Sequence, residues 1–335
     1  MRSRLSVTGV ALAVMLAACG GGGGESEAAT GTGNGASGTG SGSVGGAVGG
    51  AVSTGDAAEA AALALATVNQ ERDRCGFGRV QRQAQLDTAA GWHADYLKLR
   101  FNEGLPATHT EDPARSGFKG ATAADRAQAA GYAYARLGEF LSFAPLGGSA
   151  PAGEALVRAM MATVYHMAGM LDGNTEVGAA VAFADAAPQA YRQAILAWET
   201  GTPLGRQPVE PGVLLTYPCS GSAGLQPYMY GESPEPFSGL GFTAGPGTGH
   251  PIYLRAPAGQ RIRLNAATLT SGQGRAVPVL LYHASDDAQA LLGTHQAFVI
   301  PREPLAQGAS YQAQVQGTVD GVPFSRDFVF STGRL

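Results

Sequence analysis

Three cysteines are the residues whose chemistry the sequence defines most clearly. Cys19 follows Leu16-Ala17-Ala18, and these four residues resemble the bacterial lipobox, in which small side chains fit the peptidase cleft and the cysteine thiol is acylated. The other two, Cys75 and Cys219, either form a disulfide in an oxidising compartment or remain two separate buried thiols. Their distance depends on the fold, so both alternatives stay open.

The segment before Cys19 is typical of an export signal. Arg2 and Arg4 form a short basic region, and residues 5–18 are apolar but too few to span a bilayer. These features predict a lipoprotein signal peptide over 1–18 and an acyl anchor on Cys19, with an ordinary secretory signal as the alternative. Gly20, in place of Asp after the cysteine, favours the outer membrane in a cell that has one.

Composition and local motifs narrow the function classes. The 335 residues carry a formal net charge of -4 and 14% charged residues, so the chain has no general attraction for nucleic acid or anionic lipid. The sequence contains no Gly-x-Ser-x-Gly, His-Glu-x-x-His, Walker or Cys-x-x-Cys motif. No enzymatic chemistry therefore follows from a local motif.

The first half of the chain divides into a tether and a mixed unit. Residues 19–55 are rich in Gly, Ser, Thr and Ala, and they predict a flexible tether because they lack apolar groups that would offset the entropy of ordering. The next unit, 56–202, combines predicted helices with two late strands. The helices are predicted over 57–74, 86–99, 122–131 and 155–171, and the strands over 176–183 and 191–198.

A Pro-rich stretch then opens an all-β unit, residues 203–335. Its short strands are separated by Gly and Pro turns, which is the spacing of a β-sandwich. The clearest strands are 252–254, 277–282, 297–300, 311–315 and 324–330. Asp320-Gly321 predicts a tight turn between the last two.

The mixed unit also contains seven short motifs in a characteristic order. They are Val68-Asn69 with Arg72, Leu86 to Leu97, His109-Thr110, Asp125-Arg126 with Gly131-Tyr132, Gly138-Glu139, Tyr165-His166 and Glu176-Val177-Gly178. In this order they resemble the CAP superfamily of cysteine-rich secretory proteins, antigen 5 and pathogenesis-related proteins, as it occurs in bacteria. The resemblance implies an α-β-α sandwich with a central antiparallel sheet.

The C-terminal unit is similar to bacterial Ig-like modules. Residues 216–225 resemble their opening strand, and residues 304–332 resemble their closing hairpin. The expected fold class is therefore α+β, with a CAP α-β-α sandwich followed by an all-β Ig-like sandwich. Such modules usually act as spacers or docking surfaces, and a bridge between Cys75 and Cys219 would clamp this one onto the CAP-type unit.

The resemblance further implies a cleft that holds two histidines and one or two acids. Carried over by position, these residues are His109, Glu139 and His166. The family's second acid would fall near Thr163 and is missing, and Phe140 stands where the family has Asn. Two imidazoles and a carboxylate could ligate zinc and leave positions open for water, so His109 and His166 are candidate metal ligands.

Each of these side chains also has a structural interpretation. His109 could be solvated in its loop, His166 could be a hydrogen-bonded core residue, and Glu139 could bridge a loop. Among the remaining histidines, His93 lies on an apolar helix face and is interpreted as packing. The C-terminal His250, His283 and His295 have no partners at ligand spacing, and the last two are predicted in surface loops.

Three hypotheses about function follow from this pattern. The first is an exported, lipid-anchored and non-enzymatic CAP-domain protein of the cell envelope that binds a lipid, a glycan or another envelope protein. The second is a zinc-dependent hydrolase that uses His109, Glu139 and His166. The third is a purely structural role, which predicts neither bound metal nor a cleft of ligand size.

Overall fold

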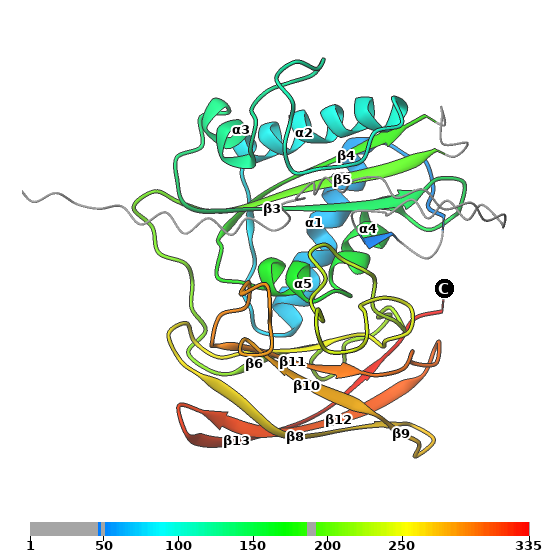
Figure 1. The fold of residues 1–335 in the computed structure, drawn as a ribbon, viewed down its shortest axis with the longest axis vertical. Helices are drawn as coiled ribbons and strands as arrows, with labels where there is room; N and C mark the ends of the chain where they lie inside the picture. Colours follow the sequence, from blue (N-terminus) through cyan, green and yellow to red (C-terminus); the bar gives the residue numbers. More distant parts are fainter. Residues whose placement is uncertain (1–45, 48–50, 186–191, 335) are drawn as a thin grey trace, which may run out of the picture.

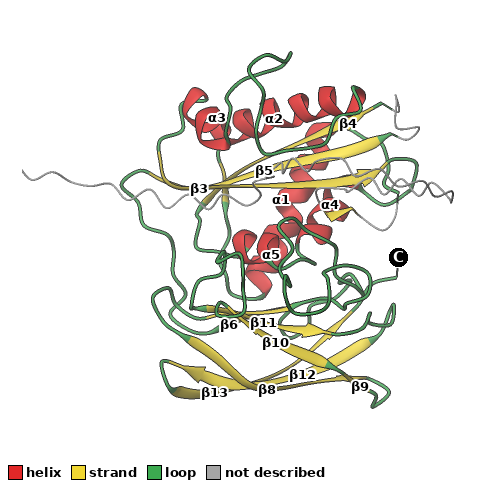
Figure 2. Ribbon diagram, viewed as in Figure 1, coloured by secondary structure: helices red, strands yellow, loops and turns green. Residues whose placement is uncertain are grey.

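The computed structural model describes residues 46–47, 51–185 and 192–334 (Figure 1). The predicted signal peptide over 1–18, the predicted lipidation site Cys19 and most of the predicted tether over 19–55 lie outside the described residues. The described chain combines helices with several largely antiparallel sheets (Figure 2), so the α+β class is confirmed.

A five-stranded sheet forms the centre of the N-terminal part. Its strand order is β1-β3-β5-β4-β2, in which β3, β5 and β4 are antiparallel and the two short edge strands are parallel to their neighbours. The bounds are β1 Gly46–Ala47, β2 Gln81–Arg82, β3 Tyr134–Pro145, β4 Glu176–Ala184 and β5 Gln193–Pro203. The strands predicted over 176–183 and 191–198 are thereby confirmed as β4 and β5.

Helices cover both faces of this sheet (Figure 1). One face carries α2 (Ala84–Asn102) and α3 (Ala123–Ala129), and the other carries α1 (Ala57–Arg74), α4 (Ala152–Met160) and α5 (Tyr165–Met170). Local capping explains where two of them begin. Asp56 accepts a hydrogen bond from the backbone N–H of Glu59 (2.9 Å) at α1, and Thr122 and Asp125 form a capping box at α3.

Two features of this part differ from the sequence-based expectation. The helix predicted over 155–171 is interrupted between α4 and α5, because the Glu232 carboxylate accepts the backbone N–H groups of Val164 (2.5 Å) and Tyr165 (3.0 Å). Strand β3 was not predicted, because its sequence Tyr134–Pro145 does not alternate between polar and apolar residues.

The end of the predicted tether belongs to the folded part. β1 pairs with β3, and Val52 is fully buried, with its N–H donating to the carbonyl of Pro145 (2.8 Å). The backbone of Ala51 passes so close to Gly148 that a Cβ at position 148 would lie 1.8 Å from the Ala51 carbonyl oxygen. Folded structure therefore begins before residue 56, where the segment pairs with β3 and buries Val52.

The C-terminal part consists of two four-stranded antiparallel sheets that pack against each other (Figure 1). One has the order β10-β11-β7-β6, with β6 Leu215–Tyr217, β7 Ile252–Arg255, β10 Val279–His283 and β11 Gln296–Pro301. The other has the order β13-β12-β8-β9, with β8 Ile262–Ser271, β9 Ala276–Val277, β12 Ser310–Val319 and β13 Val322–Ser331.

The tight turn predicted at Asp320-Gly321 is confirmed. It joins β12 to β13, and both residues have positive φ (49° and 82°), as a two-residue hairpin turn requires. His283 lies at the end of β10 and not in a surface loop, and its Nδ1 is 3.1 Å from an Asp286 oxygen.

The two parts are joined covalently and by a shared core. Cys75, at the end of α1, forms a disulfide with Cys219, just after β6, and their Cα atoms lie 5.5 Å apart. The rings of Phe77 and Tyr253 stack across the junction, with centroids 6.3 Å apart. Among the described residues, no helix is long and apolar enough to cross a membrane.

Candidate functional site

Glu139 lies at the centre of a buried charged cluster between β3 and the α2/α3 layer. Its Oε1 is 2.8 Å from His109 Nδ1, and its Oε2 accepts a hydrogen bond from the Arg126 guanidinium (2.5 Å). In the sheet, Glu139 pairs directly with Glu199 of β5, so two carboxyl groups meet inside the protein. The structure thus brings two of the three predicted site residues, His109 and Glu139, into contact.

A second ring of contacts surrounds this pair. His93, fully buried on α2, places Nδ1 3.0 Å from Glu111 Oε1 and Nε2 3.0 Å from the carbonyl of Thr108. Arg126 lies 3.6 Å from the same Glu111 oxygen, and Glu111 also accepts the backbone N–H of Lys119 (2.8 Å). His93 is therefore a packed and hydrogen-bonded residue, as predicted, and it also belongs to the charged cluster.

The pKa values of the two central carboxyl groups are shifted in opposite directions. Burial alone would raise the pKa of Glu139, but neighbouring His93, the hydrogen bond with His109 and the Arg126 charge outweigh it and hold this pKa well below its usual range. Burial and the adjacent negative charge of Glu139 raise the pKa of Glu199 well above its usual range. Glu139 is therefore ionised at neutral pH, whereas the environment of Glu199 favours its protonated form.

His166 lies on the opposite face of the sheet. Side chains of successive strand residues point to opposite faces, so Phe140 faces away from the Glu139 cluster. The Phe140 ring meets His166 edge-on, with centroids 5.8 Å apart. His166 Nδ1 is 3.0 Å from Glu232 Oε2 and 3.1 Å from Thr163 Oγ1.

This geometry does not fit the predicted zinc site. A tetrahedral site needs at least three donors around one point. His109 and Glu139 are adjacent, but Arg126 occupies the second oxygen of Glu139, and His166 faces the other side of β3. Within the described part of the chain, no group of three His, Cys, Asp or Glu side chains could hold a metal ion.

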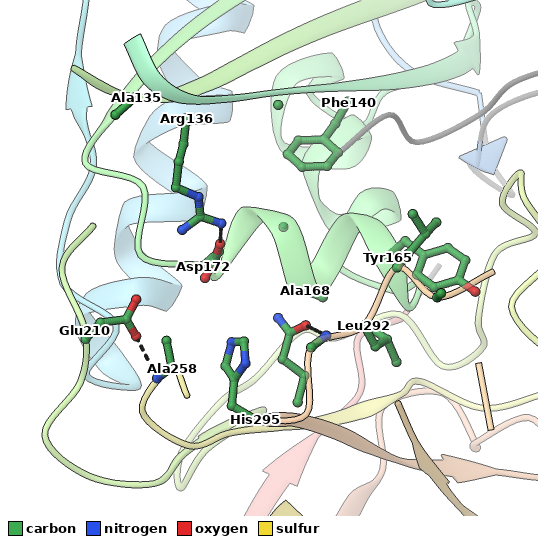
Figure 3. Close-up of a pocket in the computed structure, with 16 residues that line it drawn as sticks. Ala135, Arg136, Phe140, Tyr165, Ala168, Asp172, Glu210, Ala258, Leu292 and His295 are labelled. Atoms are coloured by element: carbon green, nitrogen blue, oxygen red, sulfur yellow. Dashed lines mark hydrogen bonds and ion pairs between the residues drawn. The ribbon is translucent and has the colours of Figure 1, made fainter. Parts of the chain in front are cut away.

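A pocket of about 560 Å³ lies where the two parts of the chain meet (Figure 3). The N-terminal part contributes side chains from β3, α5 and the turn after α5, and the C-terminal part contributes the linker, the turn after β7 and the segment before β11. The lining residues used below are Arg136, Phe140, Tyr165, Asp172, Glu210, Ala258, Leu292 and His295. His295, predicted in a surface loop, is half-buried in this pocket.

Several residues of the cluster and of the junction were not predicted as site residues, although for two of them the sequence contains a local indication. Arg126 belongs to the Asp125-Arg126 motif on which the family resemblance rests, so its position was singled out without a role for its charge. Glu199 directly follows the apolar run Ile195 to Trp198, and a carboxyl group in such a run indicates a buried acid. For Glu232 no local signal exists, because its partners lie 66 to 68 residues earlier.

Comparison with known proteins adds little to this geometry. No protein-family model and no curated protein matches the chain. Among solved structures, the chain is similar to selenomethionine PcoC, a copper resistance protein from Escherichia coli, at 16% identity, over 35% of this chain and 94% of that chain, with a TM-score of 0.21. At this TM-score the similarity carries no conclusion about the fold or function of the present chain.

Proposed function

We propose that this chain is an exported, lipid-anchored and non-enzymatic binding protein of the cell envelope. It consists of a CAP-type domain, residues 56–202, followed by an Ig-like domain, residues 203–335. The layered sheet with helices on both faces and the pair of four-stranded sheets support this arrangement. The Cys75–Cys219 disulfide fits an oxidising compartment, where such bonds persist.

The observation that carries a binding function is the junction pocket. Its volume of about 560 Å³ falls in the range of about 300–1,000 Å³ that is usual for small-molecule sites. Boundaries between domains are a common location for such sites. Charged, aromatic and apolar side chains from both parts of the chain converge on it.

The charged cluster, by contrast, favours a structural role for His109 and Glu139. The Glu139 carboxylate contacts His109 through one oxygen and Arg126 through the other, and the Arg126 charge lowers its pKa, which makes it a weak base. Since His166 is engaged with Glu232 on the other face, the three residues do not act on one substrate atom. The hydrolase hypothesis requires that convergence.

Metabolic labelling with an alkyne analogue of palmitate tests the anchor. The wild-type protein should incorporate the label and sediment with membranes, whereas Cys19→Ser should lose the label. An unlabelled wild-type protein would overturn the lipoprotein part of the proposal.

Native mass spectrometry tests binding and metal content in the same samples. The wild-type protein should retain a small molecule that Ala258→Trp, in which the new ring fills the pocket, has lost. Ala223→Trp, at an exposed alanine outside the pocket, is the matched control. Stoichiometric zinc that is lost in both His109→Ala and His166→Ala would contradict the non-enzymatic proposal and support the hydrolase.

A further inference from the structure

The junction pocket has one apolar wall and one polar wall (Figure 3). Phe140, Ala168 and Leu292 form the apolar wall, and the first two come from β3 and α5 of the N-terminal part. The polar wall carries Arg136, Asp172 and Glu210, while His295 extends from the C-terminal part into the space between the walls. A ligand that fills this space must present an apolar face on one side and hydrogen-bonding groups on the other.

The charges of the polar wall balance one another. Arg136 forms an ion pair with Asp172, Asp172 Oδ1 accepts from Arg255 (3.0 Å), and Arg255 also donates to Glu210 Oε2 (2.8 Å). Two arginines thus alternate with two carboxylates along a continuous ladder. An anionic ligand would meet Asp172 and Glu210, and a cationic ligand would meet Arg136, while Arg255 is buried behind the two carboxylates and balances their charge. The wall therefore favours an uncharged ligand with both donors and acceptors.

His295 supplies a polar group without a protein partner. Within residues 46–47, 51–185 and 192–334, neither of its ring nitrogens forms a hydrogen bond, and neither is sealed from solvent. Burial and the charge of Arg255 lower the pKa of His295, so at neutral pH the ring presents one donor and one acceptor nitrogen. A half-buried imidazole in this state gains most from a partner that both donates and accepts.

The loop that closes the pocket is held in one conformation. The buried carboxylate of Asp287 accepts the backbone N–H groups of Leu291 (2.7 Å) and Leu292 (2.9 Å) and the hydroxyl of Tyr165 (2.5 Å). Within this loop Ala290 has a φ of 54°, in the left-handed region that non-glycine residues rarely adopt. Strain held by a buried anchor is characteristic of preorganised binding sites.

From these observations we infer that the junction pocket binds an uncharged saccharide of monosaccharide or disaccharide size. A sugar ring combines an apolar C–H face, which matches the Phe140 side, with hydroxyl groups that donate and accept at once. Those hydroxyls match the balanced ladder and the free nitrogens of His295. The inference rests on the proposed binding function and names its ligand class as a glycan.

A lipid tail fits the same space less well. An acyl chain would place hydrocarbon against the charged ladder from Arg136 to Glu210 and would remove solvent from both nitrogens of His295 without giving them a partner. Both changes cost free energy. A fatty-acid carboxylate would additionally face Asp172, whose pKa is lowered by Arg136 and Arg255 against the effect of burial. Lipid binding is therefore the alternative outcome of the test.

Isothermal titration calorimetry on the chain beginning at Gly20, which retains every described residue, tests the inference. The probes are cellobiose and N,N′-diacetylchitobiose as neutral disaccharides, glucuronate as a charged sugar, and dodecanoate as a lipid. At least one neutral disaccharide should bind one to one with a Kd of about 1 mM or lower, and glucuronate should bind about tenfold more weakly. Ala258→Trp should abolish binding, and the control Ala223→Trp should preserve it.

His295 provides the residue-level test. His295→Phe keeps the ring but removes both nitrogens, so the Kd for the disaccharide should rise about tenfold, whereas His295→Gln should stay within about threefold of wild type. Because the ring nitrogens have no protein partner in the described chain, neither variant should change the folded state. A His295→Phe variant that binds as tightly as wild type would overturn the inference.

The failure of the inference is distinguishable from the failure of the proposed function. Dodecanoate binding that Ala258→Trp abolishes, without saccharide binding, would overturn the glycan class and leave the binding function standing. The absence of binding by all four probes would also overturn the inference. In that case the native mass spectrometry of the envelope-purified protein decides separately whether the pocket holds any ligand.

Discussion

The two faces of the central sheet contain different chemistry within one strand. On the α2/α3 face, Glu139 belongs to a cluster whose charges come from that part of the chain alone. On the α4/α5 face, the next residue, Phe140, lines a pocket whose other walls come from the C-terminal part. The side chains that surround Glu139 all come from the N-terminal part of the chain, whereas the pocket beside Phe140 is lined by both parts.

The difference separates a face whose polar groups are paired from a face that we propose for binding. The buried acids around Glu139 are neutralised by Arg126 and by hydrogen bonds, so they hold α2, α3 and the sheet together. The junction face leaves the His295 nitrogens without a partner in the described chain, and it keeps an open volume. Polar groups that lack partners beside a pocket are the ones available to a ligand.

The largest effect is expected from Arg126→Met, which keeps most of the side-chain volume and removes the charge. The fully buried guanidinium faces both Glu139 and Glu111, and its loss leaves buried carboxylates without a counterion. Removing one partner of a buried pair costs about 3–5 kcal/mol. Urea denaturation should therefore show a loss of this size in the free energy of unfolding.

Arg82→Met is the matched control for this comparison. Arg82 also pairs with a carboxylate, that of Asp87 (2.6 Å), but its side chain is half exposed. Such pairs contribute about 0–1 kcal/mol. If both substitutions cost the same, the Glu139 cluster is not held together by the balance of its charges.

The second prediction concerns the junction. The Cys75–Cys219 disulfide closes a loop between residues 144 positions apart, so the double variant Cys75→Ser with Cys219→Ser should lose about 2–4 kcal/mol of unfolding free energy. Reductant should destabilise the wild-type protein and leave the double variant unaffected. Equal stability of both proteins would mean that the shared core alone fixes the two parts to each other.

The sequence-based hypothesis of a shared cleft grouped His109 with Glu139, and these two side chains are in contact. The position of His166 could not be predicted in the same way, because it depends on which face of β3 each side chain occupies. Strand β3 has no alternating pattern of polar and apolar residues. The sequence therefore predicted neither the strand nor the face of the sheet to which each of its side chains points. A shift of one residue in such a strand exchanges the two faces.

The junction was beyond sequence-based prediction for a different reason. Glu232 interrupts the predicted helix over 155–171, but nothing near residue 232 indicates that its carboxylate reaches the backbone of Val164. The pocket likewise exists only because two separately patterned parts dock in one orientation. The disulfide between Cys75 and Cys219 was one of two alternatives that the sequence offered for the cysteines after Cys19, and the structure contains it.

The smallest expected effect is a pH dependence that originates from His250. This residue is fully buried against the Tyr217 ring, and burial together with the charge of Arg158 lowers its pKa to about 3. In the unfolded chain the imidazole has an ordinary pKa of about 6.5. The unfolded state therefore binds a proton below pH 6.5 that the folded state does not bind, so this contribution to stability is complete above pH 6.5 and is lost as the pH falls toward 3.

Between pH 6.5 and 5 this linkage should remove about 2 kcal/mol from the free energy of unfolding, at about 1.4 kcal/mol per pH unit once the unfolded imidazole is protonated. Urea denaturation at several pH values should show that His250→Phe is less sensitive to acid than wild type by this amount, whatever the offset between them at neutral pH. The difference between the two slopes isolates His250, since the carboxylates of the Glu139 cluster are present in both proteins. Parallel slopes would mean that His250 takes up its proton inside the folded junction, so that this face tolerates charge as readily as the face that contains Glu139.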